Sequence, residues 1–139
     1  MHPADDRINF MMNMSIDTGS NYNVTKTTTC FLTYHAETEF TPAPLEYRGD
    51  LDLAQSTADQ NLGSGLGNGN DESLSGTFHL FSPSSTTFVK HFIITTQMVE
   101  GQAMSFNSFI AGYVNSTSAV DAVQFKMSSG NIDAGVIKL

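Results

Sequence analysis

The chain has 139 residues, a mass of 15.1 kDa and a formal net charge of −8, which allow one domain large enough to bury a stable core. Its six Lys and Arg residues are scattered, so no basic stripe could follow a nucleic-acid backbone, and we expect no nucleic-acid partner. No segment approaches the length of a membrane-spanning helix and the first residues lack a signal-peptide pattern, so we expect neither membrane insertion nor secretion through a leader of its own.

The first predicted strand covers residues 8–16, where apolar side chains recur at a period of two. Five of them share one face: Ile8, Phe10, Met12, Met14 and Ile16. A turn is predicted at residues 17–21, because Gly19 can adopt a positive φ and Asp17 can accept a local backbone hydrogen bond. Residues 22–34 return to extended structure, rich in β-branched and aromatic side chains, and we expect the two strands to form a hairpin.

The periodicity fades between about residues 36 and 75, which predicts a long flexible excursion from the domain. Proline excludes a central strand at residues 41–44, although residues 45–48 or 51–53 could form short edge strands. The run 61–70 is rich in Gly and Asn and predicts a flexible loop. Its glycines are not followed by the Lys-Ser/Thr or the helix that a phosphate-binding loop requires.

Extended structure resumes in the second half of the chain, with strands predicted at residues 77–81, 86–99, 103–114 and 120–127. Both faces of the strand at 86–99 are partly apolar, which predicts a central strand covered on two sides. We expect three phenylalanines to help build the core: Phe88, Phe92 and Phe106.

Several strands separated by regular turns, without a convincing helix, predict an all-β fold: an antiparallel β-sandwich, jelly-roll-like, forming a single domain over residues 1–139. The last four residues, 136–139, follow a turn and have the pattern of a strand that has just begun. The pattern therefore predicts that the sequence stops inside an element rather than after one.

The sequence contains no constellation that indicates catalysis. The one cysteine, Cys30, lies in an apolar run and is expected to be a buried small hydrophobe. The four histidines never approach metal-ligand spacing, and we find neither a nucleophile elbow nor a carboxylate pair whose surroundings would split its pKa values. We therefore expect no enzyme activity, no cofactor and no metal.

Three segments carry a resemblance to a known family. The end of the chain, STSAVDAVQFKMSSGNIDAGVIKL (116–139), resembles the closing hairpin of a β-sandwich domain in virion proteins of tailed bacteriophages, described as tail-fibre or capsid-decoration components. INFMMNMSIDTGSNY (8–22) and SPSSTTFVKHFII (82–94) resemble a strand with its turn and the central strand of that family. In the family the last strand commonly continues with Tyr-Gly after the position of Leu139, and members usually carry one or two further strands before the one that begins at Arg7. The resemblance thus implies a chain truncated at both ends, or an edge supplied by another subunit.

The resemblance implies a non-enzymatic structural protein on the virion surface, assembled as a homo-oligomer and packed against other virion proteins of the capsid or tail, with the 55–75 loop pointing outward. The sequence does not separate the two locations, although the absence of a repeat shaft favours the capsid. The alternative is a carbohydrate-binding, host receptor-binding module, in which Tyr34, Tyr47 or Tyr113 stacks on sugar rings of host surface glycans. A polysaccharide hydrolase is a third and more distant hypothesis.

Overall fold

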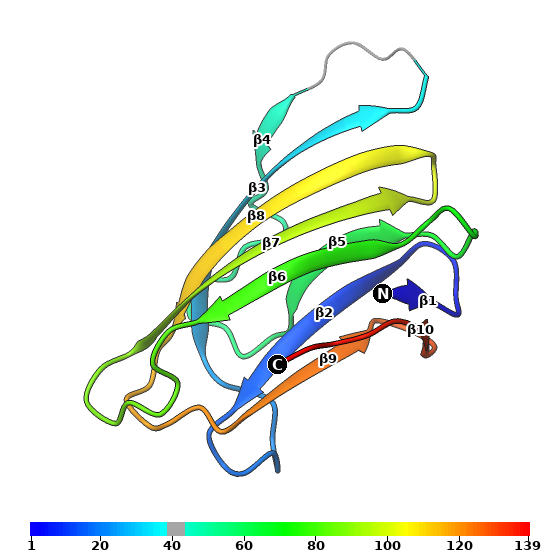
Figure 1. Ribbon diagram of the computed structural model, residues 1–139. Coiled ribbons are helices and arrows are strands. Elements are labelled where there is room, and N and C mark those ends of the chain that lie inside the picture. Colours follow the sequence, from blue (N-terminus) through cyan, green and yellow to red (C-terminus); the bar gives the residue numbers. More distant parts are fainter. Residues whose placement is uncertain (39–43) are drawn as a thin grey trace.

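The computed structural model describes residues 1–38 and 44–139, and all the regular structure in these two ranges is β-strand (Figure 1). Their ten strands are β1 (His2–Pro3), β2 (Ile8–Ser15), β3 (Lys26–Ala36), β4 (Leu45–Tyr47), β5 (Gln60–Leu66), β6 (Leu74–Leu80), β7 (Lys90–Glu100), β8 (Met104–Val114), β9 (Ala122–Met127) and β10 (Ile132–Ala134). The predicted proline break at residues 41–44 lies outside the described residues except for Pro44.

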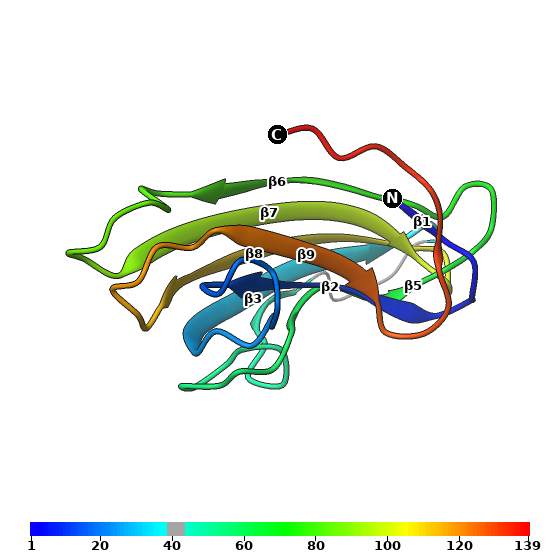
Figure 2. The ribbon, with the colours of Figure 1, turned by 90° about the horizontal axis from the view of Figure 1, so that it is seen from below.

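Hydrogen bonds link eight strands into one antiparallel sheet that folds over on itself. The first layer has the strand order β4-β3-β8-β7-β6, and every residue of β6 pairs with β7. The order β5-β2-β9 forms the second layer, which joins β7 at the pair Leu66↔Glu100. Figure 1 shows β6 in front of β5 where the layers divide, and Figure 2 shows the same arrangement from below. A separate ribbon pairs β1 with β10. The predicted all-β antiparallel sandwich is therefore confirmed.

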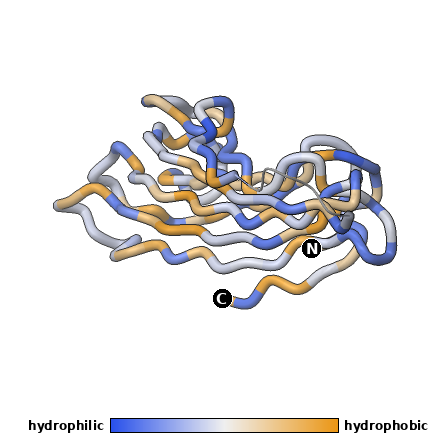
Figure 3. Tube along the Cα trace, turned by 90° about the horizontal axis from the view of Figure 1, so that it is seen from above, coloured by the Kyte–Doolittle hydropathy of each residue, from blue (hydrophilic) through white to orange (hydrophobic). Residues whose placement is uncertain are grey.

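The core lies between the two layers and is built from alternate residues of the strands. Figure 3 shows hydrophobic and hydrophilic stretches alternating along the trace. The ring of Phe125 on β9 bridges the layers, because it lies 5.9 Å from the ring of Phe10 on β2 and 6.3 Å from that of Phe78 on β6. Each fully buried aliphatic or aromatic side chain contributes about 1.5–3 kcal/mol to stability. The core members that are almost inaccessible to solvent include Met12, Met14, Leu66, Phe92, Ile94 and Ile110.

The predicted hairpin between residues 8–16 and 22–34 is wrong, although both segments contain strands. β2 pairs with β5 and β9, whereas β3 pairs with β4 and β8 in the other layer. The turn itself is present, with Gly19 at φ 76° and the Asp17 carboxylate accepting the backbone N–H of Asn21. The period of a strand defines its two faces but not its partners, and residues 22–25 carry the chain from one layer to the other.

The predicted loop at residues 61–70 is wrong up to Leu66, where β5 forms an inner strand. Gly63 is closely packed there, because a Cβ atom at this position would lie 2.5 Å from Leu74 Cδ1 and 2.8 Å from Met98 Sδ, and these side chains would have to shift. The edge strand predicted at residues 45–48 is confirmed as β4, and residues 51–53 form no strand.

Three expectations for the strand at 86–99 and the chain end are also corrected. Phe88 is 72% exposed because β7 begins only at Lys90, after an irregular segment, whereas Phe92 is 1% exposed and belongs to the core as predicted. Phe106 is partly buried against that core. β7 is not covered on both sides, since Ile93 on its outer face is 50% exposed. The last strand is β10, and residues 136–139 are exposed and outside any strand.

Candidate functional site

The most distinctive surface of the molecule is the outer side of the layer β4-β3-β8-β7-β6. Cross-strand register places the odd-numbered residues of these strands on the side that faces away from the core. No second layer covers this side within residues 1–38 and 44–139. Large apolar side chains are exposed across it, among them Phe31 on β3, Ile93 on β7 and Phe109 on β8. We call this surface the outer sheet face.

The outer sheet face contains no formally charged residue at its strand positions, although the chain carries a net charge of −8. Aromatic, aliphatic, hydroxyl, amide and imidazole side chains occupy these positions. They are Thr27, Thr29, Phe31, Thr33 and His35 on β3; Leu45 and Tyr47 on β4; Ser75, Thr77 and His79 on β6; His91, Ile93, Thr95, Gln97 and Val99 on β7; and Ser105, Asn107, Phe109, Ala111 and Tyr113 on β8.

Aromatic rings are aligned across neighbouring strands of this face. The rings of Phe31 and Phe109 are stacked with their centroids 5.0 Å apart, and Tyr47 occupies the register position next to Phe31 on β4. Offset stacking of this kind favours a fixed orientation of the rings. The face therefore presents an ordered apolar row beside its hydroxyl and amide groups.

A groove of about 380 Å³ lies on the same face, toward the start of β7. Its lining includes Phe81, His91, Ile93 and Tyr113, together with the small side chain of Ala111. The Tyr113 ring lies 6.2 Å from the His91 ring, and its hydroxyl accepts a hydrogen bond from Gln55 Nε2 at 3.1 Å. Such a groove can accept an apolar side chain or one face of a sugar ring.

The structure does not bring the three predicted tyrosines together. Tyr47 and Tyr113 both lie on the outer sheet face but at separate register positions, and the Tyr47 hydroxyl donates to the Asp52 carboxylate. Tyr34 belongs to the opposite, inward parity of β3 and stacks on Phe106 with the ring centroids 5.2 Å apart. A site that used all three tyrosines at once is therefore incompatible with the fold.

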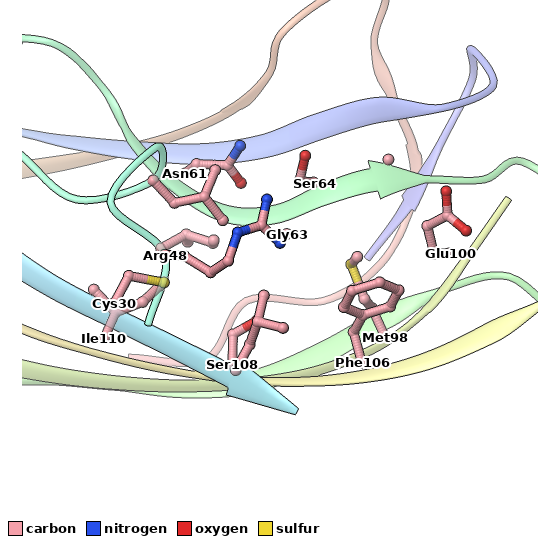
Figure 4. A pocket seen from close by; sticks show the side chains of 14 residues that line it. Cys30, Arg48, Asn61, Gly63, Ser64, Met98, Glu100, Phe106, Ser108 and Ile110 are labelled. Carbon is pink, nitrogen blue, oxygen red and sulfur yellow. The ribbon is translucent and has the colours of Figure 1, made fainter. Parts of the chain in front are cut away.

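A second hollow, of about 190 Å³, lies between the layers (Figure 4). β5 forms one wall, and the inward residues of β3, β7 and β8 form the other. The Arg48 side chain lies within the lining and donates to both carboxylate oxygens of Asp50, at 2.8 and 2.7 Å, which lowers the pKa of Asp50. Asn61 Oδ1 is buried without a hydrogen-bond donor. A polar hollow of this size accommodates water, the usual partner of such an atom.

The same hollow offers little for nucleophilic chemistry. Cys30 lines it and is buried as predicted, and burial raises the pKa of its thiol to about 11. A thiol in that state is a poor nucleophile because the thiolate is the reactive form.

Among the described residues, no cluster of three or more His, Cys, Asp and Glu side chains is arranged to hold a metal ion. Nor does any helix in those parts of the chain have the length and apolarity needed to cross a bilayer.

Sequence reasoning missed the outer sheet face, although a signal for it was present. Residues 27–36 and 104–114 contain no Asp, Glu, Lys or Arg in an acidic chain, and both segments became long neighbouring strands. It also missed the buried contact between Lys26 and Asn13, because these residues lie on separate strands and alternation gives no indication of their proximity.

Comparison of the chain with protein-family models, with curated protein sequences and with solved structures finds no match in any of the three. The resemblance to phage virion domains therefore stays a prediction made from the sequence.

Proposed function

We propose that this chain is a non-enzymatic structural domain that assembles by packing its outer sheet face against the same face of a second copy. The observation that supports the proposal is the absence of formal charge from this aromatic face in a chain of net charge −8. Clusters of exposed apolar side chains mark interaction surfaces, and Phe31, Ile93 and Phe109 are exposed on this face.

The size and chemistry of the face suit a second copy of the chain. Its roughly twenty strand positions match the number of residues that each partner contributes to a standard interface. Interface centres are depleted of charged residues and enriched in aromatic ones. Two copies that both carry −8 repel each other, so a face whose strand positions carry no charge offers the approach with the fewest like charges, and the Asp52 carboxylate bound by Tyr47 lies beside the edge strand β4.

The proposed place of this assembly is the surface of a tailed-phage particle, as a capsid-decoration or tail-fibre component in contact with other virion proteins. Support for that location comes from the sequence resemblance of residues 8–22, 82–94 and 116–139. Mass spectrometry of purified phage particles whose genome encodes this sequence tests the proposed location directly, since a decoration or fibre protein is present in a fixed copy number per particle.

Sedimentation equilibrium of the purified chain tests the assembly. We expect a two-fold oligomer, which Ile93→Glu weakens about tenfold or more because a carboxylate on the half-exposed Ile93 would be buried unpaired between copies. Val136→Glu is the matched control, because it adds the same charge at an exposed apolar residue outside the outer sheet face.

The proposal fails if the wild-type chain remains monomeric at every concentration at which it stays in solution. Equal weakening by Ile93→Glu and Val136→Glu would also contradict it, since the effect would then follow from net charge rather than from the face.

A second candidate function, glycan binding, is favoured by the groove beside Tyr113 and His91. An aromatic wall next to the Thr27 and Thr29 hydroxyls provides both stacking and hydrogen bonding for a sugar. Glycan-array binding that Tyr113→Ala abolishes and Tyr34→Ala leaves unchanged would favour this function, because Tyr34 lies on the inward side of β3.

A further inference from the structure

A lysine and an asparagine face each other in the interior, one from each layer of the sandwich. Lys26 on β3 is 0% exposed and Asn13 on β2 is 1% exposed. Lys26 Nζ donates to Asn13 Oδ1 at 2.8 Å and to the carbonyl oxygen of Val24 at 3.1 Å. Because a C=O bond is about 1.2 Å long, Nζ lies no more than about 4 Å from the amide carbon Cγ of Asn13.

The other side of the Asn13 amide is held by a carboxylate. Asn13 Nδ2 donates to Asp59 Oδ1 at 2.9 Å and to the carbonyl oxygen of Thr57 at 3.1 Å. Asp59 Oδ2 in turn forms an ion pair with Lys126 Nζ at 2.7 Å. The backbone N–H of Met14 donates to Asn13 Oδ1 at 2.9 Å. An amine, a carboxamide and a carboxylate are thus brought together with the amide in the middle.

We propose that Lys26 and Asn13 join in an intramolecular isopeptide bond, for which Asp59 carries the proton. The neutral Nζ amine attacks Cγ of Asn13, and a bond forms between these two atoms. In the tetrahedral adduct both nitrogens are attached to Cγ, which brings Nζ next to Nδ2 and its hydrogen-bond partner Asp59, so Asp59 can accept the proton that Nζ loses and deliver it to Nδ2. The Cγ–Nδ2 bond then breaks and ammonia leaves. The step needs no oxidant or other reactant, and it goes beyond the proposed assembly without depending on it.

The surroundings of Lys26 favour the reaction. Burial lowers the pKa of its ammonium to about 8, against the nearby charge of Asp59, so a usable fraction is the neutral amine near neutral pH. A buried ammonium without a carboxylate in direct contact is costly, and a secondary amide removes that charge. Attack requires Nζ above the amide plane, a position reached by rotation about the soft χ2 torsion of asparagine.

Asp59 is suited to carry a proton between two nitrogens. Burial alone would raise its pKa, but the hydrogen bonds from Lys126 and Asn13 and the charges of Lys126 and Lys26 outweigh this and lower it. Asp59 therefore begins as a carboxylate that can accept a proton. The ion pair with Lys126 holds it in place.

Lys90 provides an internal comparison. It is also 0% exposed, but its Nζ donates to three backbone carbonyls, those of Ser85, Phe88 and Ser116. Neither lysine is accessible to solvent, and within the described residues Lys26, unlike Lys90, has a hydrogen bond to a side-chain amide. We expect no bond at Lys90.

Peptide mapping of the wild-type protein after denaturation tests the bond. Trypsin cuts after Arg7, Lys26 and Arg48, so an unlinked chain releases peptide 8–26. A linked chain resists cleavage after Lys26 and releases peptide 8–48, lighter by one ammonia. A further cut after Tyr22 leaves the pieces that contain Asn13 and Lys26 joined. Cleavage after Lys90 in the same digest is expected to be complete.

Two variants separate the bond from other losses of ammonia. Lys26→Gln keeps a polar side chain but has no nucleophile, so the loss of ammonia is expected to disappear. Asp59→Asn keeps both reacting groups, and we expect it to reduce the linked fraction at least tenfold after equal incubation.

The proposal would be overturned if protein that had first folded normally were then denatured and cut completely after Lys26. A loss of ammonia would not rescue it in that case, since a succinimide at Asn13 also loses ammonia but leaves Lys26 free. Linkage of Asp59→Asn at the wild-type rate would overturn the role given to Asp59.

Discussion

At the scale of single residues, buried polar side chains determine how the layers meet. Thr28 on β3 donates its hydroxyl hydrogen to Gln60 Oε1 on β5 at 2.7 Å and accepts the backbone N–H of Leu53 at 2.9 Å. Gln60 Nε2 donates to the carbonyl oxygen of Leu51 at 3.0 Å. Because Thr28 and Gln60 are both buried, each hydrogen bond replaces one that water would otherwise provide.

Thr28→Val is expected to lower the free energy of unfolding by about 2–4 kcal/mol, because it leaves Gln60 Oε1 and the Leu53 N–H without partners at nearly constant volume. Thr29→Val on the exposed side of the same strand is the control and should change stability by less than about 0.5 kcal/mol. Urea denaturation monitored by far-UV circular dichroism measures both. Equal effects of the two variants would mean that the Thr28 network contributes nothing specific.

At the scale of elements, alternation predicted strands well wherever one face is apolar and the other polar, as in β2 and β9. It failed at β5 because the glycines of this segment are typical of a loop. In the structure Gly63 belongs to a packed strand, and its lack of a side chain lets the side chains of Leu74 and Met98 approach the backbone. Alternation also placed the start of this strand too early, because it assigned Phe88 to the core-facing side, whereas β7 begins only at Lys90. Pairing between distant segments, such as β2 with β9, leaves no trace in local periodicity.

Gly63→Ala tests the packing role of this element. The added methyl group would overlap Leu74 Cδ1 and Met98 Sδ, and we expect a loss of about 1–3 kcal/mol in the free energy of unfolding. Gly49→Ala is the control, since the nearest atom to a Cβ there is a Tyr47 ring carbon at 3.9 Å and its φ is not positive. Thermal melts of the two variants under identical conditions compare them. An unchanged melting temperature for Gly63→Ala would show that the side chains of Leu74 and Met98 shift without cost, and would contradict the packing role.

At the scale of the whole molecule, the charges are kept away from one side of the sandwich. The strand positions of the outer sheet face carry no formal charge, so the net −8 belongs to the rest of the surface and to the loops. The lack of charge in residues 27–36 and 104–114 could be read from the sequence. The two segments display this property on one shared, uncovered face because β3 pairs with β8. Composition alone does not predict that pairing.

This distribution predicts how salt affects self-association. The repulsion between two copies is long-ranged and screened over about 10 Å at 0.1 M salt, whereas the proposed contact contains no ion pair to weaken. The dissociation constant should therefore fall several-fold as sodium chloride is raised from low to physiological concentration. Sedimentation equilibrium over a salt series measures this dissociation constant, with the Ile93→Glu variant as the control. Weaker association at higher salt would indicate an ionic contact and contradict the proposed one.

The uncharged outer sheet face also limits how far assembly can proceed. In the proposed assembly, a two-fold axis would bring one such face onto another, so that each copy has used this face and the net negative charge stays on the exposed remainder of the pair. Neighbouring pairs then repel one another like charged colloidal particles instead of stacking into filaments. In the proposed assembly, a single surface without charge would thus stop association at the pair, because the net negative charge on the outside opposes further stacking.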